Sequence, residues 1–206
     1  MTPAAGNSVR PRLVLASASP RRLELLRQIG LEPDAVMPAD VDEFPKSRER
    51  AADLARRLSC AKATYVAGQA GAAFVLAADT VVACGRRILP KAEDESTART
   101  CLDLLSGRRH RVITGIALRA PDGRLRQRQV TSIVTFKVLS EKERAWYLAS
   151  GDWRGKAGGY AIQGLAAPFV RHLSGSYSNV VGLPLYDIAA MLGGLGYPLY
   201  RPADRA

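Results

Sequence analysis

The sequence has few of the residues on which disulfides, zinc centres and histidine chemistry depend. Its 206 residues include three cysteines, Cys60, Cys84 and Cys101, and two histidines, His110 and His172. An odd number of cysteines without a Cys-x-x-Cys spacing argues against a disulfide framework or a zinc site. Cys60 and Cys101 fall in helical patterns, where a thiol packs as a small buried apolar group. Each histidine stands alone in a strand-like segment and is interpreted as structural.

Long apolar runs are also missing. No segment reaches the ~18 consecutive apolar residues that a membrane-spanning helix needs, so no membrane partner is expected. Residues 1–11 contain no apolar core of signal-peptide length and are predicted to form a disordered tail. Since neither a membrane span nor a signal-peptide core is present, a cytoplasmic location is expected. Because no Pro/Ser-rich linker divides the remainder, we expect a single domain over residues 12–206.

Basic residues outnumber acidic ones, but they form no block. The chain carries 30 lysines and arginines, 24 of them arginine, against 19 acidic residues. A net charge of +11 favours an anionic partner, either nucleic acid or a phosphorylated small molecule. The alternative is a set of arginines spread over a solvated surface. No run of five like charges occurs, which argues against a basic nucleic-acid-binding arm. Neither a Walker A loop nor the glycine fingerprint of Rossmann folds is present.

Apolar periodicity predicts alternating strands and helices. Strands are expected over 12–17, 34–39, 72–78, 110–120, 129–139 and 168–173. Helices are expected from Pro20 to Gly30, after Ser47 with Leu54, Leu58, Ala61 and Tyr65 on one face, before Ser106, from Ser140, and around Leu185. In the strand over 129–139, one half-buried face is predicted to carry Val130, Ser132, Val134, Phe136 and Val138. Alternation interrupted by a hairpin is typical of an α/β fold with a mixed sheet and flanking helices.

The segment "SASPRR", residues 17–22, has the composition of an anion site. Ser19 followed by Pro20 predicts a helix start. The helix dipole disfavours cations in the first turn, where Arg21 and Arg22 are placed. A bound phosphate, held by helix amides, by the hydroxyl of Ser17 and by both guanidinium groups, would offset that cost. The alternative is a surface helix with two solvated arginines.

Three further stretches carry polar residues that suit phosphate chemistry. Asp79 follows the apolar run 72–78, at the end of a buried strand, which makes it a candidate base or Mg²⁺ ligand. The alternative is a structural carboxylate that accepts hydrogen bonds from loop amides. Glu43 belongs to the acidic loop "DVDE", whose clustered oxygens suit a divalent cation. The alternative is an ordinary solvated acidic loop. Lys62 and Lys91 are candidates for phosphate contacts or for surface positions.

The segment "GKAGGYAIQG", residues 155–164, has four glycines in ten residues. A glycine backbone can approach a ligand closely, or it can form a mobile connection without a ligand. Gln163 presents a donor and an acceptor on one amide group, which suits the edge of a nucleotide base.

Six motifs in this order resemble the Maf family of nucleoside triphosphate pyrophosphatases. They are "LASASPRRLELL", "VDE", "AADTVV", "LLSGRRHRVITG", "KAGGYAIQG" and "GSYSNVVGLPL", and the resemblance spans roughly Leu13 to Leu192. It implies a mixed α/β fold with two lobes around a central cleft, similar to that of the inosine triphosphate pyrophosphatases. It also implies hydrolysis of a nucleoside triphosphate to the monophosphate and pyrophosphate, a divalent cation (Mg²⁺ or Mn²⁺) and a cytoplasmic homodimer.

The resemblance also implies roles for individual residues. Asp79 matches the proton acceptor, and with Glu43 it is expected to hold the metal. The positions linked to substrate choice correspond to Arg21, Thr80 and Gln163. The remaining polar residues of the cleft correspond to Ser17, Arg22, Lys62 and Lys91. The motif endings resemble the subgroup acting on dTTP and UTP, so the expected substrates are dTTP and UTP, with modified pyrimidine nucleotides left open. The alternatives are 7-methyl-GTP or another modified purine as substrate, or a non-catalytic nucleic-acid-binding regulator of cell division. At 90–92 the chain reads "PKA" where the family often reads "GKP".

Overall fold

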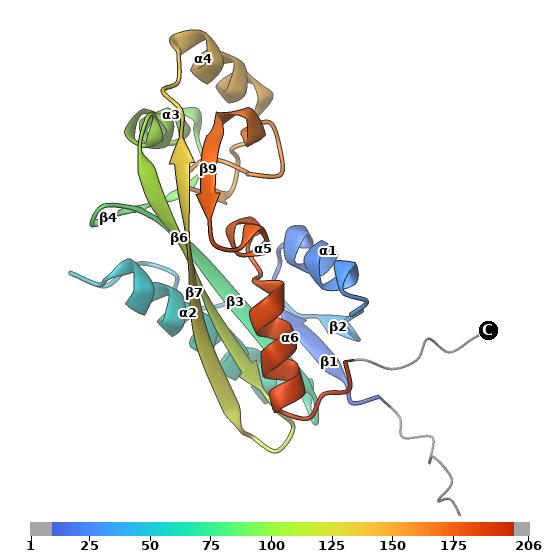
Figure 1. The fold of residues 1–206 in the computed structure, drawn as a ribbon. Coiled ribbons are helices and arrows are strands. Elements are labelled where there is room, and N and C mark those ends of the chain that lie inside the picture. The colour runs from blue at the N-terminus through green and yellow to red at the C-terminus, as the bar shows by residue number, and fades with distance from the viewer. Residues whose placement is uncertain (1–9, 200–206) are drawn as a thin grey trace, which may run out of the picture.

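The computed structural model describes residues 10–199, which form one mixed sheet with helices on both faces (Figure 1). The strands follow in the order β2-β1-β3-β6-β7-β9, and β4 pairs with β3 outside this path. Their bounds are β1 Leu13–Ala16, β2 Ala35–Val36, β3 Phe74–Cys84, β4 Arg87–Leu89, β6 Arg109–Arg119, β7 Leu125–Phe136 and β9 Val170–Ser174. A separate two-stranded sheet joins β5 (Lys91–Ala92) to β8 (Lys156–Ala157). The predicted fold class is confirmed.

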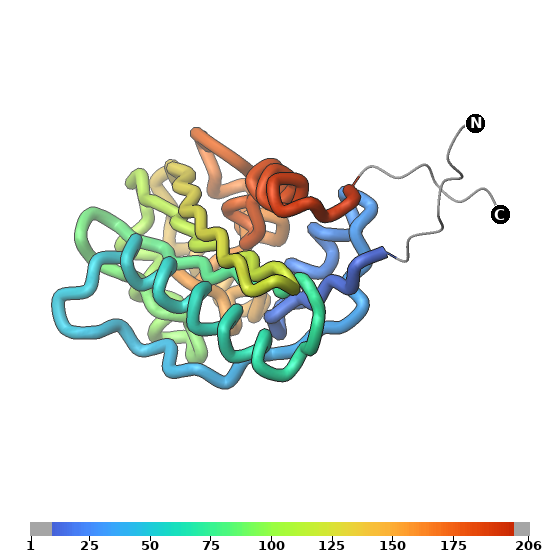
Figure 2. The backbone as a smooth tube through the Cα atoms, turned by 90° about the horizontal axis from the view of Figure 1, so that it is seen from below, coloured from blue at the N-terminus to red at the C-terminus, as the bar shows by residue number. Residues whose placement is uncertain are grey.

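The helices divide between two lobes that share the long strands β3, β6 and β7. Their bounds are α1 Pro20–Gln28, α2 Ala51–Ala70, α3 Glu95–Leu105, α4 Glu141–Ser150, α5 Tyr177–Val181 and α6 Leu185–Gly194, with a 3-10 turn at Ala167–Phe169. One lobe contains α3, α4 and β9; the other contains β1 and β2, with α2 on one face of the sheet and α6 on the opposite face (Figures 1 and 2). Within residues 10–199 no helix has the length and apolar character needed to cross a bilayer.

Successive side chains of β1 and β3 point to opposite faces of the sheet, and both faces are covered, which explains why the two strands are apolar throughout. Leu13 and Leu76 pack with α1 and α6 on one face, whereas Val14 and Val75 pack with α2 on the other. Strands buried on both faces read as continuous apolar runs, so the prediction for 72–78 is confirmed. Several local predictions are confirmed as well: Pro20 opens α1, Gly30 follows it at a φ of 71°, and Ser140 closes a capping box with Glu143.

The predicted strand over 72–78 was expected to end at Asp79, and this is wrong. β3 runs on to Cys84, and Asp79 lies mid-strand, opposite Gly115 of β6. The first neighbour of β3, β1, ends at Ala16 opposite Ala77. β3 continues because β6 pairs with it from Val75 to Ala83, so the backbone on either side of Asp79 keeps a strand partner. Asp79 therefore lies just beyond the carboxyl end of β1 rather than at the end of its own strand.

The predicted start and apolar face of α2 also need correction. The helix begins at Ala51 with Arg50 as N-cap, not after Ser47, and Tyr65 is 41% exposed. The buried stripe instead contains Lys62 and Val66. Lys62, for which a surface position was one of the two expectations, is buried at 7% exposure.

Close packing of α2 on β6 depends on Gly115. A Cβ there would lie 2.2 Å from the carbonyl oxygen of Ala55. The helix therefore contacts the sheet directly opposite Asp79, and Lys62, two turns along the same face, reaches that carboxylate.

Some smaller predictions differ from the structure. β7 ends at Phe136, and Val138, predicted to share its half-buried face, is 78% exposed. Cys101 is buried as expected, whereas Cys60 is only partly buried. Of the tail predicted over 1–11, residues 1–9 lie outside the described residues; Arg10 forms an ion pair with Asp34 at 2.8 Å.

Candidate active site

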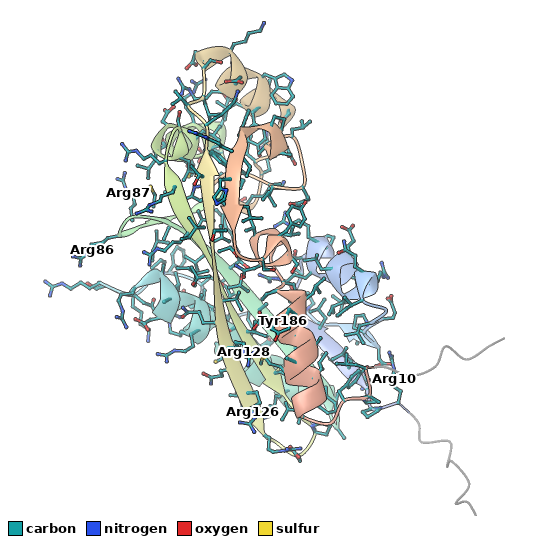
Figure 3. All side chains as sticks on the ribbon, in the orientation of Figure 1. Arg10, Arg86, Arg87, Arg126, Arg128 and Tyr186 are labelled. Atoms are coloured by element: carbon teal, nitrogen blue, oxygen red, sulfur yellow. The ribbon has the colours of Figure 1, made fainter. Side chains whose placement is uncertain are left out.

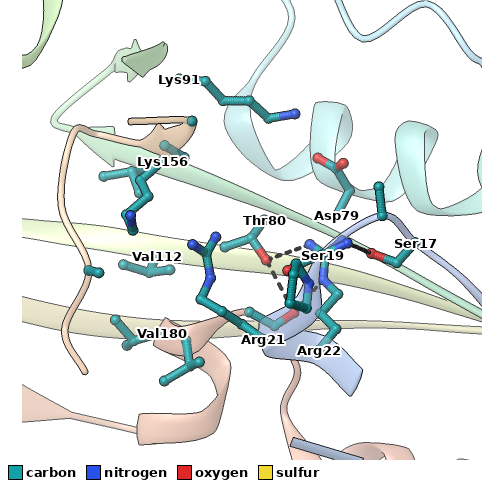
Figure 4. Close-up of a pocket in the computed structure, with 18 of the residues that line it drawn as sticks. Ser17, Ser19, Arg21, Arg22, Asp79, Thr80, Lys91, Val112, Lys156 and Val180 are labelled. Atoms are coloured by element: carbon teal, nitrogen blue, oxygen red, sulfur yellow. Dashed lines mark hydrogen bonds between the residues drawn. The ribbon is translucent and has the colours of Figure 1, made fainter. Parts of the chain in front are cut away.

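The polar residues singled out in the sequence converge on one cleft of about 370 Å³ between the lobes (Figure 4). The cleft opens beyond the carboxyl end of β1, at the part of β3 that extends past its pairing with β1. Its lining includes every predicted site residue: Ser17, Arg21, Arg22, Glu43, Lys62, Asp79, Thr80, Lys91 and Gln163. These residues come from α1, α2, β3, β5 and three loops, so folding brings together what the chain separates by up to 146 positions. Their individual roles remain predictions.

Four of these side chains form a continuous chain of ion pairs. Lys62 Nζ lies 2.6 Å from Asp79 Oδ1 and 2.5 Å from Glu43 Oε1. The second oxygen of Glu43, Oε2, lies 2.5 Å from Lys91 Nζ. Asp79 and Lys62 are 6% and 7% exposed, so this charge alternation compensates two ions that burial would otherwise penalise strongly. Although the chain reads "PKA" at 90–92 where the family often reads "GKP", Lys91 lies on β5 and its side chain lines the cleft.

Glu43 is strongly acidic in this setting. Burial by itself raises the pKa of its carboxyl group, but hydrogen bonds from Lys62 and Lys91 outweigh that effect and lower the pKa to about 2. The carboxylate is therefore ionised throughout the neutral range and is available to a cation.

Arg22 is held by the protein from several sides. Its guanidinium donates to Gly182 O at 2.9 Å, to Ser17 Oγ at 3.1 Å and to Thr80 Oγ1 at 3.3 Å. Burial lowers the pKa of Arg22, while Asp79 acts in the opposite direction. Arg21 diverges from Arg22 toward Lys156 and Val112 (Figure 4). The two arginines are thus not equivalent: one is fixed within a network and the other extends into the cleft.

The glycine-rich loop is fixed at both ends by Asp152. One carboxylate oxygen of Asp152 lies 3.3 Å from Lys156 Nζ, and the other accepts a hydrogen bond from Leu165 N at 3.0 Å. Gly164 N also bonds to Ala161 O, which turns the backbone around Gln163. A Cβ at position 164 would lie 2.2 Å from Asp152 Oδ2, so this close approach needs glycine. The loop is therefore held in place by these bonds and lines the cleft, rather than being only a mobile connection.

Sequence reasoning missed three residues of this region. Lys156 and Tyr160 line the cleft, and Thr114 Oγ1 lies 2.9 Å from Thr80 Oγ1. Lys156 and Tyr160 stand inside the glycine-rich motif, which was itself the available signal. Thr114 lies within an apolar strand and offered none. The hydroxyl of Tyr160 is 2.8 Å from His110 Nε2, and burial lowers the pKa of that histidine to about 4, so His110 is a neutral partner of this tyrosine.

Two carboxylates could hold a divalent cation. Glu43 and Asp79 bond to the same ammonium and are hard oxygen donors. Over residues 10–199 no cluster of three or more His, Cys, Asp or Glu side chains forms a metal site. This donor set fits Mg²⁺, which is commonly bound through one or two carboxylates and completes its shell with water and substrate phosphates.

Outside the cleft the exposed arginines are dispersed. Arg86 and Arg87 project from the β3–β4 hairpin, whereas Arg126 and Arg128 lie on the far part of β7 (Figure 3). Arg128 is paired with Asp187 at 2.9 Å.

The family model described as Maf-like protein matches residues 12–195. The chain belongs to the Maf family. A relative from Paramagnetospirillum magneticum, named dTTP/UTP pyrophosphatase, is 67% identical over 185 residues, which cover 90% of this Maf chain and 97% of the relative. A relative of the same name from Rhodospirillum rubrum is 64% identical over 185 residues, or 90% of this chain and 88% of the relative. Both matches confirm the family resemblance identified in the sequence.

Among solved structures, a HAM1 protein from Coxiella burnetii is similar in fold to this Maf chain. The TM-score is 0.50 at 13% identity, and the match covers 89% of this chain and 99% of that one. At this level of identity the similarity concerns the fold alone.

Proposed function

We propose that this Maf chain hydrolyses dTTP and UTP to the nucleoside monophosphate and pyrophosphate. The observation that carries the proposal is the composition of the cleft: five cationic side chains and two carboxylates, all lining one cavity. Such a site binds a polyphosphate through its cations and retains a carboxylate to accept a proton. The relatives named dTTP/UTP pyrophosphatase support the choice of substrate.

In the proposed reaction, water attacks the α-phosphorus and the bond to the bridging α,β oxygen breaks, so pyrophosphate leaves. Asp79 orients the water and accepts its proton. Arg21, Arg22, Lys62 and Lys91 bind the phosphates and stabilise the charge that develops on their oxygens. Glu43 and Asp79 would hold Mg²⁺ or Mn²⁺, which supplies charge neutralisation across the phosphate oxygens when bound.

Base selection is assigned to the residues around the glycine-rich loop. The Gln163 amide offers both a donor and an acceptor to the base edge, and Thr80 lines the same cleft within the Arg22 network. Arg21 extends into the same space (Figure 4). We propose that these three side chains set the preference for pyrimidine nucleotides.

We also propose that the enzyme acts as a cytoplasmic homodimer.

The test is pyrophosphate release from a panel of nucleoside triphosphates in Mg²⁺, including dTTP, UTP, the other standard nucleotides and 7-methyl-GTP. Selective release from dTTP and UTP supports the proposal, and selective release from 7-methyl-GTP identifies a modified-purine enzyme instead. Release from no nucleotide, together with nucleic-acid binding that falls steeply with salt, identifies a binding protein. Hydrolysis in ¹⁸O-labelled water checks the bond that breaks: attack at the α-phosphorus places the label in the monophosphate.

A further inference from the structure

The segment that carries Glu43 has no regular secondary structure of its own. Residues 37–50 connect β2 to α2 without a helix or strand. Phe44, next to Glu43, is 82% exposed and so gives the segment little core packing. Yet Glu43 must keep both carboxylate oxygens aligned with Lys62 and Lys91, at 2.5 Å each. Something other than local structure has to fix this backbone.

Arg57 of α2 bonds to the segment on both sides of Glu43. Its Nη2 donates to Phe44 O at 2.9 Å and its Nη1 to Asp42 O at 3.4 Å. The two carbonyl groups belong to the residues that flank Glu43, so the guanidinium spans it. A planar group with five donors in a fixed fork can hold two carbonyl oxygens at once, which a lysine ammonium does less well.

The guanidinium is itself held in place by Glu49. Arg57 Nε and Nη2 lie 2.8 and 2.9 Å from the two oxygens of the Glu49 carboxylate, a bidentate ion pair. The Glu49 side chain is only 9% exposed, and Glu49 Oε2 also accepts a hydrogen bond from Lys46 N at 2.9 Å. The segment is therefore closed onto α2 at three points: residues 42, 44 and 46–49.

We propose that Arg57 is the positioning residue of Glu43: it fixes the backbone of residues 42–44 so that the Glu43 carboxylate is preorganised between Lys62 and Lys91. α2 then supplies both a cleft residue, Lys62, and the group that aligns its partner. This inference rests on the proposed function, in which the Glu43 carboxylate works in the cleft. Arg57 is not among the residues lining the cavity, so its effect on turnover passes through Glu43.

The primary test compares Arg57→Ala with Arg56→Ala. Arg56 is the adjacent arginine, 62% exposed, and its guanidinium pairs with Asp53 of the same helix at 3.5 Å. Misplacing a working group by about 1 Å costs up to ~100-fold in rate. We expect Arg57→Ala to lower kcat/KM for dTTP by about 10- to 100-fold, and Arg56→Ala to remain close to the parent. Equal effects of the two substitutions would overturn the proposal.

A double-mutant cycle with Glu43→Gln separates positioning from general stability. If Arg57 acts through Glu43, Arg57→Ala causes little further loss of activity once Glu43 has become glutamine. An undiminished loss in the Glu43→Gln background would show that Arg57 serves the fold as a whole and would refute the assignment. Arg57→Lys, which keeps the charge without the fork, is expected to fall between the parent and Arg57→Ala.

Amide hydrogen exchange supplies a readout independent of turnover. In Arg57→Ala, exchange within residues 42–49 is expected to accelerate while β3 and β6 keep their protection. If the parent enzyme releases no pyrophosphate, the proposed function fails, and exchange still decides whether Arg57 orders this segment. Unchanged exchange in the segment would overturn the positioning role even in an active enzyme. If Arg57→Ala does not fold, Arg57→Lys and Glu49→Gln carry the same comparison.

Discussion

Lys62 and Asp79 form a buried ion pair across the interface between α2 and β3, with 2.6 Å between Nζ and Oδ1. Both residues line the cleft, and Glu43 contacts the same ammonium at 2.5 Å. One lysine thus compensates two carboxylates that the proposed reaction uses, one as proton acceptor and both as metal ligands.

Asp79→Asn is expected to reduce pyrophosphate release by ~10²- to 10⁴-fold, the usual contribution of a general base. The amide keeps the shape of the side chain, and Lys62 retains Glu43 as an ionic partner, so folding is expected to survive. The measurement is kcat for dTTP alongside thermal unfolding. Asp103→Asn, at an exposed position on α3 paired with Arg144, is the control and should leave kcat unchanged. Full turnover by the Asp79 variant would refute the assignment.

Lys62→Met is expected to destabilise the fold as well as abolish activity. Removing one partner of a buried ion pair leaves an uncompensated charge and costs about 3 kcal/mol or more. Urea unfolding at neutral pH measures this loss. The double variant Lys62→Met/Asp79→Asn removes the stranded charge too, so it should recover a large part of the stability without recovering activity. If the single and double variants are equally stable, the buried charge of Asp79 does not affect the free energy of unfolding and the prediction is wrong.

The lowered pKa of Glu43 predicts how the free energy of unfolding changes at acid pH. Lysine contacts lower its pKa from 4.5 to about 2. A carboxyl group whose pKa is depressed on folding stabilises the native state above its unfolded pKa, and this contribution disappears as pH falls through the folded value. The difference in unfolding free energy between the parent and Glu43→Gln should therefore be constant above about pH 5 and shrink between pH 4.5 and 2. A difference that does not change over this range would contradict the ion-pair chain.

Gly164→Ala is expected to weaken base selection by way of Asp152. The added Cβ would lie 2.2 Å from Asp152 Oδ2, so the carboxylate must leave Leu165 N and the backbone around Gln163 must shift. Loss of one hydrogen bond to the base corresponds to about 1 kcal/mol, or roughly fivefold to tenfold in relative kcat/KM for dTTP over purine nucleotides. Gln163→Ala should lower this ratio similarly.

Gly68→Ala provides the matched control for Gly164. Gly68 lies in α2, and an added Cβ would meet no atom within 4 Å apart from the adjoining backbone of its own helix. Its substitution should leave selectivity unchanged. If Gln163→Ala lowers selectivity but Gly164→Ala does not, Asp152 has no part in placing Gln163.

Much of this architecture was predictable because it is local. The Ser19-Pro20 start of α1, the capping box of Ser140 with Glu143 and the continuous apolar run over 72–78 each follow short-range rules. The identities of the cleft residues were predictable for a different reason. Six ordered motifs resemble a known family, and the residues within them line one cavity.

Other features could not be predicted because they depend on contacts between distant segments. β3 passes through Asp79 without interruption because β6 pairs with it there, and no pattern around residue 79 reports the presence of that partner. Lys62 is buried because Gly115 lets α2 approach the sheet opposite Asp79. No sequence pattern singles out Arg57 or Asp152, because their contacts with backbone groups of the 42–49 and 156–165 segments form only on folding.

Neighbours along the chain are enough to predict most of the helices and strands, the family and the set of polar side chains available for chemistry. How those side chains are held depends on contacts that form only when distant segments fold together. A carboxylate or ammonium takes its charge state and orientation from whatever lies within a few ångströms of it. In this protein those neighbours, Lys62 for Asp79 and Arg57 for the backbone around Glu43, come from elements that meet only after the sheet has formed.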